Sequence, residues 1–433
     1  MSKVAFITLG CKVNQYETNA MSQEFIEKGY EVVEHHEKAD IYVINTCTVT
    51  NMSDRKSRQM LRRVKELNPN SIVIACGCYV QVAKDEVAKI EDIDLILGNN
   101  EKKNIVEHLE QYQKDKKRQL EIEDLMQQRE FIEFGDVTYT EKTRAVVKIQ
   151  DGCDRFCSYC IIPYARGRVR SRKPEGIISE ITKIAQEGIK EVVITGIHVA
   201  SYGKDFKENY GLIDLLEDLN KIEGIERIRL SSIEPLILDE QFINRLSKLE
   251  KICHNFHLSL QSGCDETLKR MNRRYNTEQF KTVVNLIRNT YKDAILTADV
   301  IVGFPGETEE EFEKTYKFLE DVKFYKTHVF KYSPRKGTKA AVMENQIDGN
   351  IKEQRSKKLI ELSNNFEKEY NESYIGKTVE VLWEEEKEGS YKGHTQNYLL
   401  AYYKPEKGDM NLENKITKAN CISAESDHII VEI

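Results

Sequence analysis

The sequence has no apolar run approaching the about 20 residues that a membrane-spanning helix needs. It also lacks an excess of positive charge, because 65 Lys and Arg residues stand against 72 Asp and Glu residues, a formal net charge of −7. A protein whose whole surface attracts nucleic acid is therefore excluded, although a local basic site is not. The opening residues MSKVAFITLG carry one lysine and a short apolar run, which predicts a strand rather than a signal peptide. We expect a cytoplasmic protein with no membrane partner.

The composition also lacks the marks of disorder. The 433 residues include 7 Pro and 22 Gly, and 40% are hydrophobic, which is typical of a chain that folds around apolar cores. This length suggests two to three domains of about 150 residues each. Ten cysteines in a reducing compartment are candidate thiolate ligands rather than disulfide partners.

Apolar strands alternate with helical segments in two stretches, which predicts a multidomain α/β protein. In residues 1–112 the alternation favours an N-terminal parallel sheet covered by helices. Residues 144–345 contain six further strand–helix units, which predict a partial (β/α)6 barrel. Between them, residues 113–143 are highly charged, and the segment 111–130 has neither Gly nor Pro, so we expect a solvated helical linker.

The last part of the chain changes pattern twice. Residues 346–371 place apolar side chains three or four positions apart, from Leu359 to Tyr370, which predicts an amphipathic connecting helix. Residues 372–433 form short apolar runs separated by glycines. This pattern is typical of a small antiparallel β-barrel, and five strands would suit its length.

Three cysteines lie close together directly after a predicted strand. In DGCDRFCSYC, three residues separate Cys153 from Cys157, and two separate Cys157 from Cys160. Three thiolates on one tight loop can hold three irons of a cubane cluster and leave the fourth iron open. An open iron can chelate the amino and carboxylate groups of an amino acid. Zinc is the chemical alternative, but a structural zinc site usually has four ligands, and no fourth Cys or His is nearby.

The CX3CX2C spacing at the mouth of a partial barrel resembles the radical S-adenosylmethionine superfamily. The resemblance implies a [4Fe-4S] cluster on these three cysteines and S-adenosylmethionine bound at its open iron, where electron transfer cleaves it to a 5′-deoxyadenosyl radical. Later segments match in the same order: ITGIH (194–198), SSIEP (231–235), LSLQSG (258–263) and DVIVGFPGET (299–308). The resemblance assigns cofactor contacts to six residues: Thr195, Gly196, Ser231, Glu234, Gln261 and Asp299.

Three more cysteines each follow a predicted strand of the N-terminal sheet. Cys11, Cys47 and Cys78 come after the apolar runs of residues 3–10, 40–46 and 71–77. The carboxyl ends of parallel strands meet at one edge of a sheet, so these side chains can converge. Cys76 competes with Cys78 for this role. We favour Cys78 because it lies past the strand end, beside a loop.

The order of these motifs closely resembles the methylthiotransferases. GCKVNQYET, NTCTVT and GCYVQ precede the CX3CX2C motif, and a small β domain follows it. The resemblance makes Cys11, Cys47 and Cys78 ligands of a second [4Fe-4S] cluster that supplies or carries the inserted sulfur. It also implies a second S-adenosylmethionine as methyl donor, a C-terminal TRAM domain, and an external one-electron donor such as a flavodoxin or ferredoxin.

A basic segment follows the second motif and suggests a nucleic-acid substrate. Residues 144–173 contain eight Lys and Arg and two Asp, and arginine forks suit phosphate oxygens. The expected RNA contacts are Arg166, Arg168, Arg170, Arg172 and, by stacking, Tyr164. The helix predicted over residues 54–67 adds four arginines, although a solvated basic face would look the same. The simplest substrate is a tRNA anticodon loop, whose base can be splayed out.

Two segments resemble one branch of the methylthiotransferases in particular. PYARGRVRSR and TGIHVASYG are similar to the branch that acts on N6-threonylcarbamoyladenosine at position 37 of tRNA, which implies formation of its 2-methylthio derivative. However, residues 372–433 hold seven Lys, no Arg and twelve acidic residues, which could instead face a basic protein. A ribosomal-protein aspartate methylthiotransferase is therefore one alternative. A non-catalytic iron–sulfur protein that binds RNA or senses redox state is another.

Overall fold

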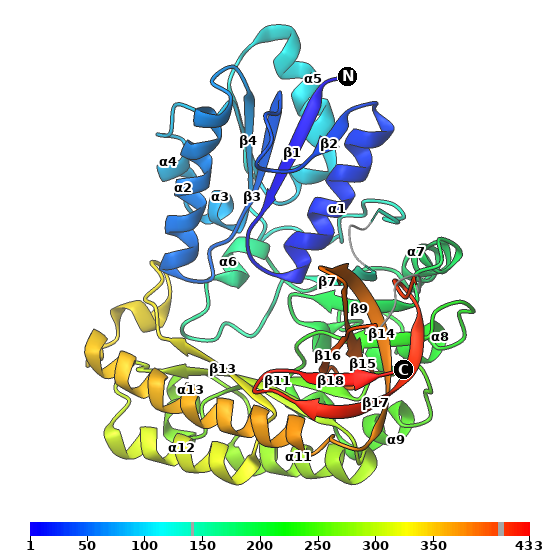
Figure 1. The fold of residues 1–433 in the computed structure, drawn as a ribbon. Helices are drawn as coiled ribbons and strands as arrows, with labels where there is room; N and C mark the ends of the chain where they lie inside the picture. The colour runs from blue at the N-terminus through cyan, green and yellow to red at the C-terminus, as the bar shows by residue number, and fades with distance from the viewer. Residues whose placement is uncertain (140–142, 406–410) are drawn as a thin grey trace.

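The computed structural model describes residues 1–139, 143–405 and 411–433. Along the chain it contains an α/β sheet domain, a partial barrel of parallel strands and a small closed β-barrel (Figure 1). This architecture confirms the predicted fold class. None of the helices in the described ranges is long and apolar enough to cross a membrane.

The N-terminal domain is a six-stranded parallel sheet with the strand order β2-β1-β3-β4-β5-β6. Apolar side chains of α1 and α5 form the core on one face, and those of α2 and α3 form the core on the other. Its elements are β1 (Lys3–Thr8), α1 (Lys12–Glu27), β2 (Glu31–Val33), β3 (Ile41–Thr46), α2 (Asn51–Leu67), β4 (Ile72–Gly77), α3 (Cys78–Val82), α4 (Lys84–Val87), β5 (Leu95–Leu97), η1 (Glu101–Asn104), α5 (Ile105–Asp115) and β6 (Gln119–Glu121).

The segment expected to be a helical linker has a different structure. Helix α5 ends at Asp115, and Lys116 takes a left-handed conformation with φ of 55°. The chain then turns back as β6, and Leu120 pairs with Ile96 of β5 at the edge of the sheet. The described residues that follow have no helix up to β7. The prediction was wrong because charge density alone does not show that a short strand can extend an existing sheet.

The middle of the chain forms the partial barrel. Six strands, β7, β9, β10, β11, β12 and β13, run parallel, and isolated bridges from Ile228 to Ile252 and from Ile233 to Leu258 connect its two halves. Its elements are β7 (Arg144–Asp151), α6 (Ile162–Arg166), β8 (Arg170–Ser171), α7 (Pro174–Gln186), β9 (Glu191–Gly196), η2 (Val199–Ser201), α8 (Leu212–Leu219), β10 (Arg227–Leu230), η3 (Pro235–Ile237), α9 (Glu240–Leu246), β11 (Asn255–Gln261), α10 (Asp265–Arg270), α11 (Thr277–Thr290), β12 (Ile295–Val302), α12 (Glu309–Val322), β13 (Lys326–Lys331) and η4 (Lys339–Val342).

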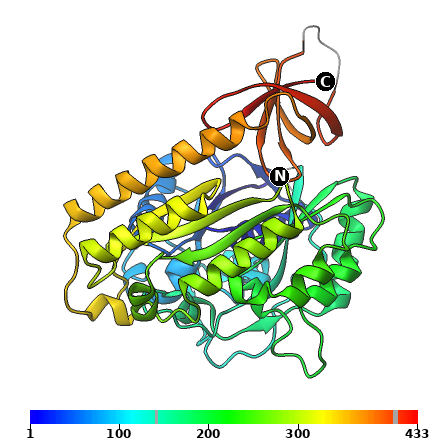
Figure 2. The same cartoon turned by 90° about the horizontal axis from the view of Figure 1, so that it is seen from below.

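Helix α13 (Gly349–Glu372) leads from the partial barrel to the C-terminal domain, as predicted. It lies along the outermost barrel strand, where the Ser363 hydroxyl accepts a hydrogen bond of 2.8 Å from the Thr327 amide. Figure 2 shows α13 beside α12, ending at the C-terminal lobe. Leu359 on its apolar stripe is fully buried in the barrel core.

The C-terminal domain is a closed five-stranded barrel with the order β14-β15-β16-β18-β17. One feature differs from the expected antiparallel arrangement, because β16 and β18 pair in parallel. The domain docks on β10, where Arg227 donates to the Glu380 carbonyl at 3.0 Å and Arg229 donates to the Gln396 carbonyl at 3.1 Å. Its strands are β14 (Thr378–Lys387), β15 (Ser390–Thr395), β16 (Leu400–Tyr403), β17 (Ile416–Ala424) and β18 (Ile429–Glu432).

Candidate functional site

The loop that carries Cys153, Cys157 and Cys160 leaves the carboxyl end of β7 in a tight turn. Gly152 has φ of 71°, and a Cβ atom there would lie 1.8 Å from the Arg168 carbonyl oxygen, so only glycine is accommodated. The Cys160 amide donates to the Cys157 carbonyl at 2.9 Å, which holds these two cysteines in one turn. All three are partly exposed at the end of the partial barrel. The loop therefore presents three thiols where a cluster can reach them.

Cys11, Cys47 and Cys78 lie at one edge of the N-terminal sheet. Their strands β1, β3 and β4 are neighbours in the sheet, and each cysteine comes one to three residues after its strand. Gly10 has φ of 109°, and a Cβ atom there would lie 2.9 Å from the Cys47 sulfur, so glycine lets the Cys11 loop approach Cys47. Cys11 is exposed, and desolvation raises the pKa of its thiol.

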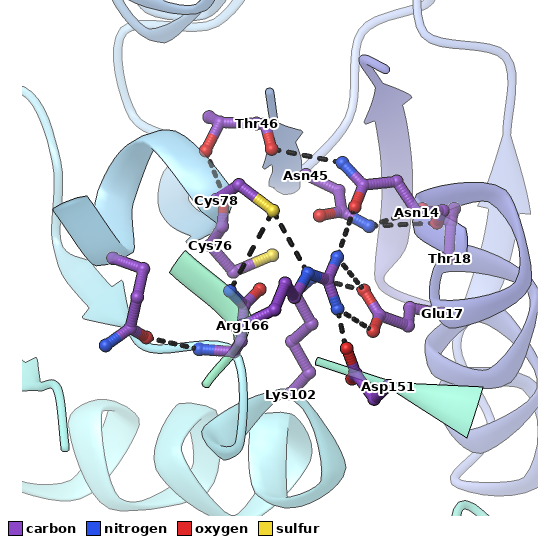
Figure 3. Close-up of polar contacts among 12 residues, drawn as sticks. Asn14, Glu17, Thr18, Asn45, Thr46, Cys76, Cys78, Lys102, Asp151 and Arg166 are labelled. Atoms are coloured by element: carbon purple, nitrogen blue, oxygen red, sulfur yellow. Dashed lines mark hydrogen bonds and ion pairs between the residues drawn. The ribbon is translucent and has the colours of Figure 1, made fainter. Parts of the chain in front are cut away.

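Cys76, the competing ligand, occupies a different environment from Cys78. Cys76 is fully buried in the apolar core between the sheet, α1 and α5, and burial raises the pKa of its thiol to about 11. Cys78 begins α3 and accepts hydrogen bonds from Arg166 Nε at 3.1 Å and from Asn99 Nδ2 at 4.0 Å (Figure 3). These contacts favour Cys78. Its assignment as a ligand stays a prediction.

The spacing of the sulfur atoms suits a cluster better than a single metal ion. Within the described ranges, no three of the six predicted ligands have their sulfur atoms all within 4.8 Å of one another. Zinc–sulfur bonds of about 2.3 Å in a tetrahedral site would bring the sulfurs closer together than that. An iron–sulfur cubane spreads its thiolates over separate metal atoms, so its ligands lie further apart. The sulfur positions therefore do not favour a single zinc ion, and three thiols at each site are the donor set that a cluster with an open iron requires.

The buried side chains beside Cys78 carry a surplus of positive charge. They are four cations and two carboxylates: Lys102, Lys148, Arg166, Arg170, Glu17 and Asp151. Burial alone would raise the pKa of Glu17, but Arg166, Lys102 and Lys148 outweigh it and hold this pKa well below its ordinary value. Because buried unbalanced charge is costly, the surplus favours an additional anion at this position. A cluster bound by thiolates supplies one.

A cavity of about 250 Å³ lies where the partial barrel meets the N-terminal domain. Cys160 lines it, and Val49 and Thr50 reach it from the loop that follows Cys47. Of the six expected cofactor contacts, Gln261 and Asp299 also line it. The cavity is thus bordered by one cysteine of the barrel triad and by the loop that follows one cysteine of the sheet triad.

The other four expected cofactor contacts lie at or just beyond the ends of β9 and β10. Thr195 and Gly196 end β9, and Thr195 is buried. Ser231 follows β10, and its buried hydroxyl has no partner among the described residues, so a ligand could supply one. Glu234 is buried and already paired with Arg155 and, at 3.2 Å, with His198. Burial alone would raise the pKa of Glu234, but these partners lower it to about 2.

Most of the arginines expected to bind RNA are internal, which corrects that prediction. The side chains of Arg166, Arg170 and Arg172 are at most 1% exposed. Arg166 and Arg170 belong to the charged cluster beside Cys78, and Arg172 pairs with Glu180 at 2.8 Å and with Glu133 at 2.7 Å. Because these three side chains are buried and are neutralised by carboxylates of other elements, they cannot contact the phosphates of an RNA. Tyr164 is exposed and Arg168 is partly exposed, so both remain candidates.

The roles of two residues in this region were not predicted from the sequence. Glu17, on α1, is the carboxylate on which Arg166, Lys102 and Lys148 converge, although these residues are widely separated in the chain. Arg273 donates from Nη1 to the Cys157 sulfur at 3.2 Å. Glu17 stands in the segment GCKVNQYET, but nothing in that segment points to these partners, and Arg273 lies outside the motifs described above. Only the folded arrangement shows that each predicted cluster has an arginine on one of its thiols.

Two family models match the chain. The model described as Radical SAM superfamily matches residues 147–319, and the model described as Uncharacterized protein family UPF0004 matches residues 3–98. Among solved structures, the radical S-adenosylmethionine methyltransferase TsrM from Kitasatospora setae shares the fold with a TM-score of 0.56. It is 14% identical, and the match covers 76% of this chain and 73% of TsrM.

Several relatives match nearly the whole chain. The threonylcarbamoyladenosine tRNA methylthiotransferase MtaB of Bacillus subtilis is 42% identical over 98% of this chain and 94% of its own length. MtaB of Aquifex aeolicus is 43% identical over 92% and 95%. A tRNA-2-methylthio-N(6)-dimethylallyladenosine synthase of Clostridium botulinum is 36% identical over 98% and 96%. This protein therefore belongs to the radical S-adenosylmethionine methylthiotransferase family.

Proposed function

We propose that the enzyme converts N6-threonylcarbamoyladenosine at position 37 of tRNA into its 2-methylthio derivative. The observation that carries this proposal is a single cavity bordered by Cys160 and by the loop after Cys47. Radical generation and sulfur delivery would then act on one bound base. The MtaB relatives of similar length support the choice of nucleoside.

The proposed cofactors are two [4Fe-4S] clusters and S-adenosylmethionine. Cys153, Cys157 and Cys160 would hold the first cluster, and Cys11, Cys47 and Cys78 the second. When bound, these groups supply a radical strong enough to abstract an unactivated C–H hydrogen, a sulfur atom and a methyl group. Acid–base chemistry cannot activate the C2–H bond of adenine, which explains why such groups are needed.

The lining of the cavity suits a planar base. Tyr159, Phe330 and Tyr332 contribute aromatic rings to it, and base stacking on such rings is the usual way in which proteins hold an unstacked nucleotide. The Tyr332 hydroxyl is buried and has no partner in the described part of the chain, so it could meet a polar edge of the base. The base must leave the loop stack to enter. The protein's part is to orient C2 and to exclude water around it.

The proposal is tested by analysing the tRNA nucleosides of a host strain that lacks this gene. Complementation with the wild-type chain should restore 2-methylthio-N6-threonylcarbamoyladenosine in digested tRNA, measured by mass spectrometry. The Cys160→Ala variant, expressed to the same level, should restore none. Appearance of the dimethylallyladenosine derivative instead, or of a methylthiolated aspartate in a ribosomal protein, would show that the substrate is wrong while the chemistry is right.

Helix α2 offers a surface for the RNA around that base. It carries six basic and two acidic residues in a chain of net charge −7. Arg55, Arg62 and Arg63 are exposed, and none has an ion-pair partner among the described residues. At the start of the helix, Asn51 accepts from Arg335 at 2.6 Å and donates from its amide to Ser333, which lines the cavity. The helix therefore leads from the cavity mouth outward as a row of free cations.

Charge reversal on α2 should weaken RNA binding without affecting the clusters. For the double variant Arg62→Glu and Arg63→Glu, we expect tRNA binding to weaken by about 1–3 kcal/mol. The slope of log K against the logarithm of salt concentration should also fall in magnitude by about 2, because two phosphate contacts are lost. The matched control reverses Lys114 and Lys117, which lie at and just beyond the end of α5, the helix on the other face of the sheet. Filter binding at several salt concentrations measures both. Equal losses in the two variants would contradict a specific surface.

A further inference from the structure

Arg166 connects the two cysteine triads through a single side chain. It is the last residue of α6 and comes six positions after Cys160, so it belongs to the partial barrel. Its side chain is fully buried and points into the N-terminal domain, between Cys78 and Glu17 (Figure 3). The same guanidinium thus contacts a predicted ligand of one cluster and is joined by a short chain segment to a ligand of the other.

Every N–H group of this guanidinium has a partner. Nε donates to the Cys78 sulfur at 3.1 Å, and Nη2 donates to Asn14 Oδ1 at 2.6 Å and Glu17 Oε2 at 3.0 Å. Nη1 donates to Glu17 Oε1 and to Asp151 Oδ2 at 3.4 Å. An arginine has five N–H donors in one plane, and here all five are used. The guanidinium cannot rotate without losing several contacts, so the donor to Cys78 is fixed in direction.

A role limited to fastening the two domains together does not account for the contact with sulfur. Glu17 is already paired with Lys102 at 2.5 Å and with Lys148 at 2.8 Å. Lys148 belongs to the partial barrel, so its pair with Glu17 already links the two domains, and Lys102 holds Glu17 from within the N-terminal domain. The radical triad repeats the pattern, since Arg273 places Nη1 3.2 Å from the Cys157 sulfur. Arg273 is held in turn by Tyr275 and by the Ser259 carbonyl. At both sites, therefore, an arginine that other hydrogen bonds hold in place donates to one cysteine sulfur.

We infer that Arg166 is a positioning residue of the second cluster. Its hydrogen bond to the Cys78 sulfur raises the reduction potential of that cluster. Reduction adds negative charge, part of which resides on the thiolate sulfurs, and a charged N–H donor stabilises it. Hydrogen bonds from outside the ligand set also fix ligand orientation. The inference rests on the proposed second cluster, because Cys78 must be one of its ligands.

The test uses full-length chains that each hold one cluster. In a background with Cys153, Cys157 and Cys160 replaced by alanine, the remaining cluster is titrated anaerobically and followed by electron paramagnetic resonance. Arg166→Lys keeps the positive charge but lacks the Nε–H donor, and we expect a lower midpoint potential with unchanged iron content. Arg273→Lys should leave this cluster unaffected. The complementary background lacks Cys11, Cys47 and Cys78. There, Arg273→Lys should lower the midpoint potential of the remaining cluster, and Arg166→Lys should leave it unchanged.

Lys102→Gln provides the control for charge. It removes a buried cation from the same Glu17 pair without touching a sulfur. A larger shift in Lys102→Gln than in Arg166→Lys would show that net charge sets the potential and would overturn the inference, as would an unchanged midpoint in Arg166→Lys. Thermal unfolding of each variant verifies that it is folded. If the background without the radical triad binds no iron, the proposed second cluster itself fails, which is a different result.

Discussion

Simultaneous replacement of Cys153, Cys157 and Cys160 by alanine is expected to abolish cleavage of S-adenosylmethionine. No 5′-deoxyadenosine should form under reducing conditions, because three irons of the radical cluster lose their thiolates. If the second cluster is present, about half the iron of the reconstituted wild type should remain, since each cubane holds the same number of irons. Iron analysis and chromatography of the reaction products measure both quantities.

The fold should survive this replacement, which makes the result interpretable. All three side chains are only partly buried, so their loss leaves no large cavity. The control is Cys253→Ala, at a cysteine that is 2% exposed in the barrel and not a predicted ligand. It should keep full iron content and full cofactor cleavage. Full iron content in the triple variant would show that this loop does not hold the radical cluster.

The arrangement of the cysteines could be predicted because it depends on local pattern. Apolar, β-branched runs mark β1, β3 and β4, and parallel strands bring their carboxyl ends to one edge. Each cysteine follows such a run directly, so sequence position sufficed to place Cys11, Cys47 and Cys78 together. Loops in α/β units are short, which leaves little freedom at this edge.

The environment of the arginines could not be predicted, because it depends on contacts between distant segments. Arg166, Arg170 and Arg172 alternate with small residues, and an exposed phosphate clamp would have the same spacing. What makes them internal is the carboxylates of Glu17 and Glu180, which different helices bring to them. Burial of a cation is decided by its partner, and no local pattern names that partner.

The acidic character of the C-terminal domain is also easier to interpret in the structure. Two of its carboxylates pair with basic residues of the partial barrel: Glu384 with Arg144 at 3.2 Å and Glu380 with Arg227 at 3.2 Å. Part of its negative charge therefore serves to dock the domain on the barrel. The charge sum of residues 372–433 gave no means of separating docking residues from a surface that meets the substrate.

Replacement of Cys78 by alanine is expected to separate the two halves of the reaction. The radical triad is intact in this variant, so S-adenosylmethionine should still be cleaved to 5′-deoxyadenosine. Sulfur insertion should be lost, because the second cluster lacks a ligand, and no methylthio product should appear by mass spectrometry. Arg166 also loses the acceptor of its Nε–H, which adds a buried unsatisfied donor and about 1–3 kcal/mol of destabilisation.

Cys76→Ala is the matched control, two residues before Cys78 and within strand β4. Its side chain is buried in the apolar core, and no hydrogen bond to its sulfur is found among the described residues, so the change should cost about 1 kcal/mol in unfolding free energy and leave product formation intact. Iron content of the two variants, measured in a background without the radical triad, gives the decisive comparison. Loss of the second cluster in Cys76→Ala and its retention in Cys78→Ala would reverse the ligand assignment. The strand-end position of Cys78 and its hydrogen bond from Arg166 both predict the opposite result.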